Sequence, residues 1–172
     1  MFKDDYKKVK SFYDNLLPLL QKKLNADKII SFEDMNDNSV SKLFDINAGI
    51  DAVSISSKGL RGIALRIQYD IEYNTFTIRY ERSSGAKTEL SKRIEAIKKG
   101  YIYPYLTCQC YYNEKNIKLL SGAICRTSDL YKFAEDNIET LEQNKRRCPE
   151  GNYFLWITFK EFEESGYKIV YF

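Results

Sequence analysis

The chemistry open to this 172-residue sequence is limited first by what it lacks, because it contains no histidine. That absence excludes Ser-His-Asp and Cys-His triads, HExxH zinc sites and the usual general base near neutral pH. Any reaction would have to use carboxylates, Lys, Tyr, Cys, hydroxyl groups or a metal ion held by oxygen ligands.

Basic residues near a glycine-containing turn suggest a site for phosphate groups. The segment 83–87 reads SSGAK and precedes an expected helix, so its backbone amides and Lys87 would lie at a helix start. Arg66 and Arg79 are expected on the adjacent strands, and guanidinium groups bind phosphate well. The alternative is an ordinary solvated polar sheet face. The other basic candidates for this surface are Arg82, Lys92 and Arg93.

The four cysteines are expected to be free thiols in a reducing cytoplasm. The chain starts without a secretory signal, and no apolar run is long enough to span a membrane. Cys108 and Cys110 are two residues apart in an expected strand and would share one face, with Cys125 on the neighbouring strand. A zinc site completed by Cys148 is the alternative, but its spacing is unusual.

Hydrophobic periodicity predicts an α+β or mixed α/β protein with a mostly antiparallel or mixed central sheet flanked by helices. An amphipathic helix is expected over 4–24, and Pro18 is a candidate kink. Alternating residues then predict a meander of three antiparallel strands at 51–56, 62–69 and 75–81. The polar face of its last two strands would carry Arg66, Gln68, Thr77 and Arg79.

The remaining elements follow the same logic. A helix over 86–99 should end at Gly100, which is the usual C-terminal glycine. Strands at 103–111 and 117–125, helices after 127 and near 160–165, and strands at 154–159 and 167–172 complete the prediction. Tyrosines such as Tyr103 and Tyr112 are either core residues or stacking platforms for unpaired bases. The chain is expected to form one domain, with a core at 1–111 and additions at 112–172.

The element order and the segment 49–53, which reads GIDAV, resemble the PD-(D/E)XK nuclease superfamily, with its restriction-endonuclease-like core. The resemblance covers about residues 4–111. It implies Asp51 as a metal ligand, Gln68 or Asp70 as the second oxygen ligand, and Lys87 as a relocated catalytic lysine. The implied cofactor is Mg²⁺, which prefers oxygen ligands and activates water against a phosphodiester. The expected acid-x-Lys pair is missing here, and the alternative is that Asp51 is a plain strand-start or turn acid.

The charge distribution favours a polyanionic partner. The 27 basic and 24 acidic residues nearly balance, but the stretch 79–99 has seven basic and three acidic residues, and 133–164 has four and eight. We expect a nucleic acid, DNA rather than RNA, as the partner, with phosphodiester hydrolysis if the protein is an enzyme. The alternative is a non-catalytic nucleic-acid- or protein-binding factor of a phage or mobile element, with the acidic C-terminal part meeting a protein.

Overall fold

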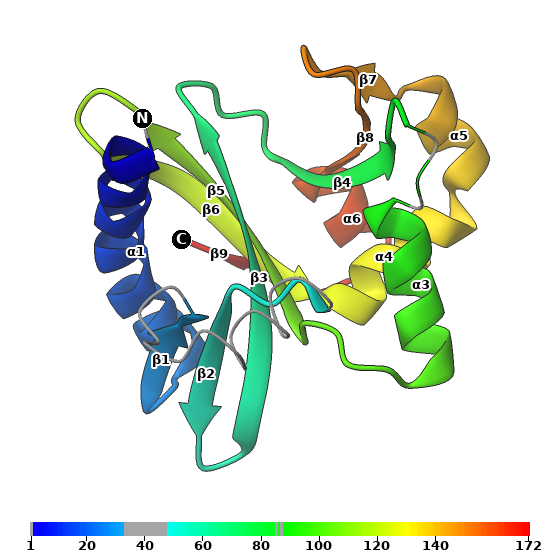
Figure 1. Ribbon diagram of the computed structural model, residues 1–172. Helices are drawn as coiled ribbons and strands as arrows, with labels where there is room; N and C mark the ends of the chain where they lie inside the picture. The colour runs from blue at the N-terminus through cyan, green and yellow to red at the C-terminus, as the bar shows by residue number, and fades with distance from the viewer. Residues whose placement is uncertain (1, 33–47, 85, 87) are drawn as a thin grey trace.

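Two β-sheets and the helices packed against them form the architecture seen in the computed structural model, which describes residues 2–32, 48–84, 86 and 88–172 (Figure 1). The expected α+β class is confirmed. The main sheet contains, in spatial order, β1 (Lys28–Ser31), β2 (Ala52–Ser56), β3 (Gly59–Tyr69), β5 (Leu106–Asn113), β6 (Lys118–Arg126) and β9 (Val170–Tyr171). The second sheet contains β4 (Thr75–Glu81), β8 (Tyr153–Thr158) and β7 (Arg146–Arg147).

Five helices are found among the described residues, namely α1 (Phe2–Leu24), α3 (Glu89–Lys99), α4 (Thr127–Asp136), α5 (Ile138–Gln143) and α6 (Phe159–Glu164). Helix α1 covers one face of the main sheet (Figure 1). It does so because Phe12, Leu16 and Leu20 recur every four residues and are fully buried. The helix continues through Pro18.

The main sheet is mixed. Strands β1, β2 and β3 form an antiparallel meander, β3 and β5 are parallel, and β6 and β9 continue antiparallel from β5. The residues of β3 that point towards α1 are Ile63, Leu65 and Ile67, as their alternation predicted. The opposite face points towards α3, α4 and the second sheet (Figure 1).

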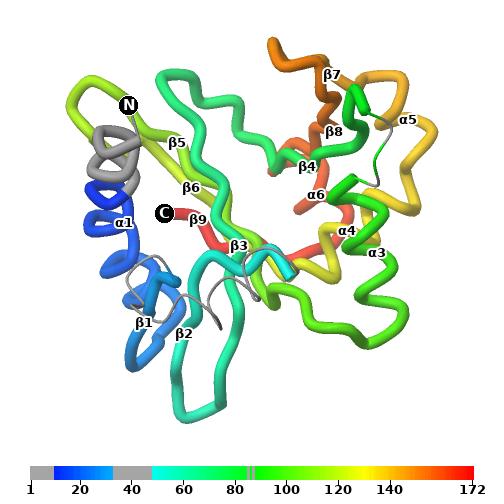
Figure 2. Tube along the Cα trace, in the orientation of Figure 1, coloured from blue at the N-terminus to red at the C-terminus, as the bar shows by residue number. Residues whose placement is uncertain are grey.

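The prediction of which three strands form the meander was wrong. Strand β4 leaves the main sheet and pairs antiparallel with β8, while β1, which the sequence did not identify as a strand, takes the third place beside β2. Figure 2 shows the chain crossing from the end of β3 to the second sheet. The alternation of β4 was correct, because Phe76 and Ile78 are fully buried. They pack against a second core with α4, α6 and β8.

Several element boundaries also differ from expectation, and the strand expected at 167–172 is limited to Val170–Tyr171. Helix α3 begins at Glu89 with Thr88 as its N-cap, so Ser83 and Ser84 do not cap it; Gly100, with φ of 67°, ends it as predicted. Strand β5 starts at Leu106 because residues 101–104 are irregular. The hairpin of β5 and β6 is confirmed.

The cysteines are free thiols, as expected. Cys108, Cys110 and Cys125 are buried, and the Sγ atoms of Cys108 and Cys110 lie 3.4 Å apart on one face. Cys125 is paired with Thr107 and therefore faces the opposite side of the sheet. Burial raises the pKa of the Cys108 and Cys125 thiols well above the usual range. At neutral pH these two thiols are therefore protonated, and both side chains belong to the core.

Candidate functional site

The polar face of β3 is covered by other parts of the protein. Arg66 and Gln68 lie on this face, and β5 presents Gln109 beside Arg66 in the parallel register. Strand β4 crosses above them, where the Thr77 hydroxyl donates a hydrogen bond to Gln109 Oε1 at 3.1 Å. The strands predicted to share a polar face therefore meet across two sheets, and the alternative of a simply solvated face is wrong at these positions.

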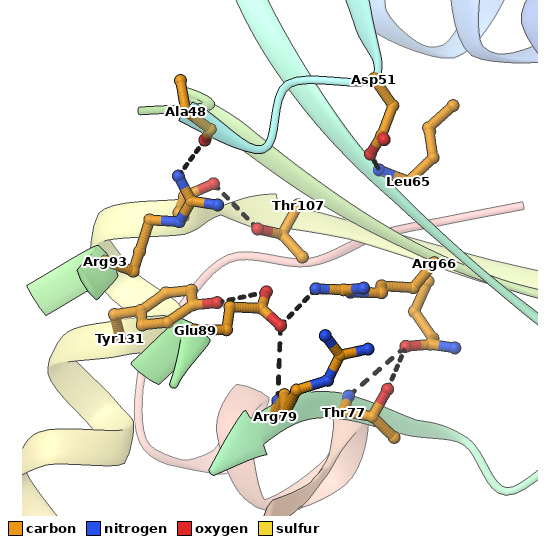
Figure 3. Close-up of polar contacts among 12 residues, drawn as sticks. Ala48, Asp51, Leu65, Arg66, Thr77, Arg79, Glu89, Arg93, Thr107 and Tyr131 are labelled. Atoms are coloured by element: carbon orange, nitrogen blue, oxygen red, sulfur yellow. Dashed lines mark hydrogen bonds and ion pairs between the residues drawn. The ribbon is translucent and has the colours of Figure 1, made fainter. Parts of the chain in front are cut away.

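Glu89, in the first turn of α3, connects the elements around this face (Figure 3). One carboxylate oxygen forms an ion pair with Arg66 and accepts a hydrogen bond from the backbone N–H of Arg79 at 3.4 Å. The other accepts a hydrogen bond from the Tyr131 hydroxyl at 2.8 Å. Glu89 thereby ties α3 to β3, β4 and α4.

The electrostatics around Glu89 and Arg66 favour the ionised form of both side chains. Burial alone would raise the pKa of Glu89, but the Arg66 charge and the hydrogen bonds outweigh it and hold the pKa below its ordinary value. Burial also opposes the charge on Arg66, yet Glu89 and, more weakly, Asp51 raise the Arg66 pKa. Burial and Glu89 together raise the pKa of Tyr131 well above the usual range. At neutral pH the pair is ionised and the tyrosine is a hydrogen-bond donor.

Arg93, expected on a phosphate surface, is instead only 8% exposed. Its guanidinium donates a hydrogen bond to the Ala48 carbonyl and lies 6.0 Å from the Tyr131 ring centroid. Gly49 adopts a φ of 59°, and a Cβ there would lie 2.7 Å from Arg93 Nη2. Arg93 therefore holds the backbone that leads into β2 (Figure 3).

The two expected metal ligands are far apart. Asp51 Oδ2 accepts a hydrogen bond from Leu65 N at 2.6 Å, whereas Asp70 Oδ1 accepts one from Glu114 N at 2.8 Å. Asp70 follows Leu65 by five residues and lies directly after the end of β3, a separation of about 16 Å at the rise of an extended strand. Since magnesium ligands lie about 2 Å from the ion, the two carboxylates do not fit a shared Mg²⁺ site.

The other expected site residues are dispersed. Arg82 and Lys92 are exposed, and Lys87 lies outside the described residues. Arg79 is half-buried, with its guanidinium 5.7 Å from the Phe154 ring centroid. Within residues 2–32, 48–84 and 88–172, no group of three or more acidic or cysteine side chains could hold a metal ion.

A groove of about 900 Å³ opens where the end of β3 faces the second sheet. Gln68 lines it from β3, and Thr77 and Phe154 line it from the second sheet. The register of the second sheet places Arg79, Trp156 and Arg146 on the same face as Thr77 and Phe154. The other residues that line the groove are Ile67, Tyr69, Tyr73, Arg146, Arg147, Cys148, Pro149, Glu150 and Trp156.

Aromatic rings and guanidinium groups meet in this groove. The Arg146 guanidinium lies over Trp156 at 3.7 Å from the ring centroid, and the Tyr73 ring is 5.1 Å from Trp156. Tyr73 is 41% exposed, and Arg146 and Arg147 are exposed as well. With Glu150 as the acidic lining residue, the groove combines flat surfaces for stacking with an excess of positive charge.

The sequence analysis missed the main groove residues. Arg146 and Arg147 lie within the stretch interpreted as acidic, and Trp156 and Tyr73 received no role. The signal was present, because a run of three basic residues, 145–147, interrupts the acidic segment and ends nine residues before the single tryptophan. Of the tyrosines considered for stacking, Tyr111 and Tyr112 are fully buried core residues, whereas Tyr101 is 59% exposed and lies outside the groove.

No protein-family model matches the sequence, and no curated protein matches it significantly. None of the helices in the described part of the chain is long and apolar enough to cross a membrane.

Proposed function

We propose that the protein is a nucleic-acid-binding factor that holds a single strand in the groove between β3 and the second sheet. The observation that carries the proposal is the cluster of Arg146, Trp156 and Tyr73, in which the Arg146 guanidinium lies 3.7 Å from the Trp156 ring centroid and the tilted Tyr73 ring lies 5.1 Å from it. Unpaired bases stack on aromatic rings and on guanidinium planes with little sequence preference, at about 1–3 kcal/mol per base. Binding in this form needs no catalytic group.

Positive charge along the groove supports the same proposal. Arg146 and Arg147 both line the groove, and Arg79 lies on the same face of the second sheet as Arg146. Arg66 is already paired with Glu89, so Arg79, Arg146 and Arg147 supply the charge for phosphate groups. Phosphate contacts release counterions, which makes affinity fall as salt rises. DNA remains the expected nucleic acid, and the groove chemistry is common to DNA and RNA.

The test is fluorescence anisotropy with labelled 12-nucleotide single strands of DNA and RNA, titrated with the whole protein between 50 and 200 mM salt. We expect binding that weakens with salt, and Trp156→Ala should weaken it about tenfold or more. Tyr101→Ala is the matched control, because Tyr101 is 59% exposed but lies outside the groove. Binding that is unaffected by Trp156→Ala and by Arg146→Ala with Arg147→Ala would contradict the proposal.

Hydrolysis of a phosphodiester is the second candidate function. The observation in its favour is that the ion pair of Glu89 with Arg66 places a carboxylate against β3 two residues from Gln68, which lines the groove. Incubating the bound strand with Mg²⁺ or Mn²⁺ tests it. Cleavage that disappears in Asp51→Asn would replace the binding-only proposal with an enzyme. If no strand binds at all, a protein partner of the acidic C-terminal part becomes the better hypothesis.

A further inference from the structure

Two arginines and a tyrosine meet at the end of β3 that lies away from the groove. Arg61 is the third residue of β3, Arg126 is the last residue of β6, and Tyr105 directly precedes β5. Because Leu106 pairs with both Ile63 and Arg126, the three strands lie side by side at this end of the main sheet.

This cluster lies on the face of the main sheet that α1 covers (Figure 1). Arg61 and Arg126 are each two residues from an isoleucine of the core under α1, so their side chains point to that face, and Tyr105 packs against the same core. Gln68, which lines the groove, points to the opposite face. It is seven residues from Arg61, about 23 Å at the rise of an extended strand. The cluster is therefore separate from the groove.

Both guanidinium groups of the cluster contact one aromatic ring and have no acidic partner. The Cζ atoms of Arg61 and Arg126 lie 4.8 Å and 5.5 Å from the Tyr105 ring centroid. The two Cζ atoms are therefore at most about 10 Å apart. Within the part of the chain that the structure describes, neither guanidinium forms an ion pair or a hydrogen bond. Arg126 is exposed and Arg61 partly exposed, so both can reach a ligand.

An anion with regularly spaced phosphates complements this arrangement. Each guanidinium presents its N–H donors in a planar fork that binds a phosphate group through two hydrogen bonds. The contact with Tyr105 restricts both arginine side chains, so less entropy is lost when they bind. A nucleic-acid backbone carries phosphates in succession along each strand, so neighbouring phosphates can bind the two guanidinium groups at once. A bound backbone would also offset the repulsion between the two positive charges.

We infer that Arg61, Tyr105 and Arg126 form a second nucleic-acid contact, at which backbone phosphates bind to the two guanidinium groups. Contacts with the backbone carry no sequence information, so this contact holds strands of any base composition. A strand long enough to reach both sites is held by base stacking in the groove and by its phosphates here. This inference rests on the proposed function and adds a second binding surface to it.

The experiment measures anisotropy of a labelled dT strand of about 30 nucleotides, titrated with the full chain between 50 and 200 mM salt. For single strands, each phosphate contact adds about 0.7 to the slope of log affinity against log salt concentration. Arg61→Gln with Arg126→Gln should therefore reduce the slope by about 1.4 and weaken binding at low salt about tenfold or more. Arg126→Gln alone should remove about half of that slope. Trp156→Ala should weaken binding and leave the slope unchanged.

Lys132→Gln with Lys160→Gln is the matched control, because it removes the same charge from exposed positions on α4 and α6. It should keep the slope of the unmodified protein. An unchanged slope in the double arginine variant, with binding that still requires Trp156, would overturn the inference and leave the proposed function standing. Equal losses in the arginine and lysine variants would overturn it too, because net charge would then explain both.

The reverse result separates the two sites from the other side. A loss in the double arginine variant, with no effect of Trp156→Ala or of Arg146→Ala with Arg147→Ala, would support the second contact and contradict the groove. If no strand binds at all, both are overturned.

Discussion

Glu89 connects several elements of the fold, which its position in a short polar stretch of the sequence does not indicate. Its carboxylate contacts Arg66 from β3, Tyr131 from α4 and the backbone of Arg79 from β4. We expect Glu89→Gln to lower the free energy of unfolding by about 2 kcal/mol, because Arg66 loses its charged partner and the hydrogen bonds become weaker. Urea denaturation at pH 7 measures this.

Glu135→Gln, which breaks the exposed pair with Lys98, should cost less than about 1 kcal/mol. Equal effects of the two substitutions would show that Glu89 has no special role.

The same carboxylate predicts a pH dependence. Its pKa is lower in the folded protein than in the unfolded chain, so the unfolded state binds protons more readily as pH falls. The stability from Glu89 is therefore complete above the unfolded pKa, near 4.3 by reference values, and is lost as pH falls through the folded value. Unfolding curves of the unmodified protein and Glu89→Gln should converge as pH is lowered from 6 to 3. A constant difference across that range would contradict the assignment.

At the scale of elements, α3 and the segment that enters β2 are joined by Arg93 and Gly49. Alanine at Gly49 would meet two penalties, the positive φ of 59° and a Cβ 2.7 Å from Arg93 Nη2. Gly100 has a similar φ of 67° with nothing within 4 Å, so Gly100→Ala isolates the backbone penalty of about 1–2 kcal/mol. We expect Gly49→Ala to destabilise the protein more than Gly100→Ala, measured by thermal unfolding.

A double substitution tests the cause. If Arg93 produces the additional penalty, Gly49→Ala combined with Arg93→Ala should cost less than the sum of the two single changes. Additive effects would instead indicate that the backbone conformation alone accounts for the loss.

The sequence predicted most elements but not their partners. Helix α1 was predictable because its apolar residues repeat every three or four positions, and β4 because Phe76 and Ile78 alternate with polar residues. The partner of β4 was not predictable, since β8 lies more than 70 residues away and no local signal links the two. Strand β1 was missed because four residues, KIIS, are too few to show a period.

The candidate site was predictable only in part for the same reason. Arg66, Gln68, Thr77 and Arg79 were assigned to one polar face, and these residues do lie near one another. Arg146 and Trp156 join them only because β7 and β8 pair next to β4. The prediction that Arg93 lies on a phosphate-binding surface was wrong. Amphipathic spacing does not show which basic residue of a helix donates a hydrogen bond to a buried carbonyl, here that of Ala48.

For the whole molecule, Tyr111 joins the two sheets. From β5 its hydroxyl donates a hydrogen bond to the Thr75 carbonyl at 2.8 Å and accepts one from Thr75 N at 3.0 Å. Tyr111→Phe should lower the free energy of unfolding by about 1–3 kcal/mol, because both backbone groups of Thr75 lose a partner in a buried site. Chemical denaturation with urea gives the value.

Tyr112 provides the matched control for that substitution. It is also fully buried, but its hydroxyl donates a long hydrogen bond of 3.5 Å to the Phe12 carbonyl. Tyr112→Phe should therefore cost less than Tyr111→Phe. The opposite order would show that the hydroxyl of Tyr111 does not fasten the second sheet to the first.

The pairing of β4 with β8 also bears on how the protein comes into being. Thr75 pairs with Thr158 and Glu81 with Tyr153, so the chain must close loops of 83 and 72 residues before the second sheet exists. Pairing over such distances is slow, since the entropy of loop closure is lost before contacts compensate for it. During synthesis the β1–β2–β3 meander leaves the ribosome well before β8 is made. The two walls of the groove, β3 and the second sheet, are therefore synthesised at different times. We expect the groove to be among the last features of the protein to form.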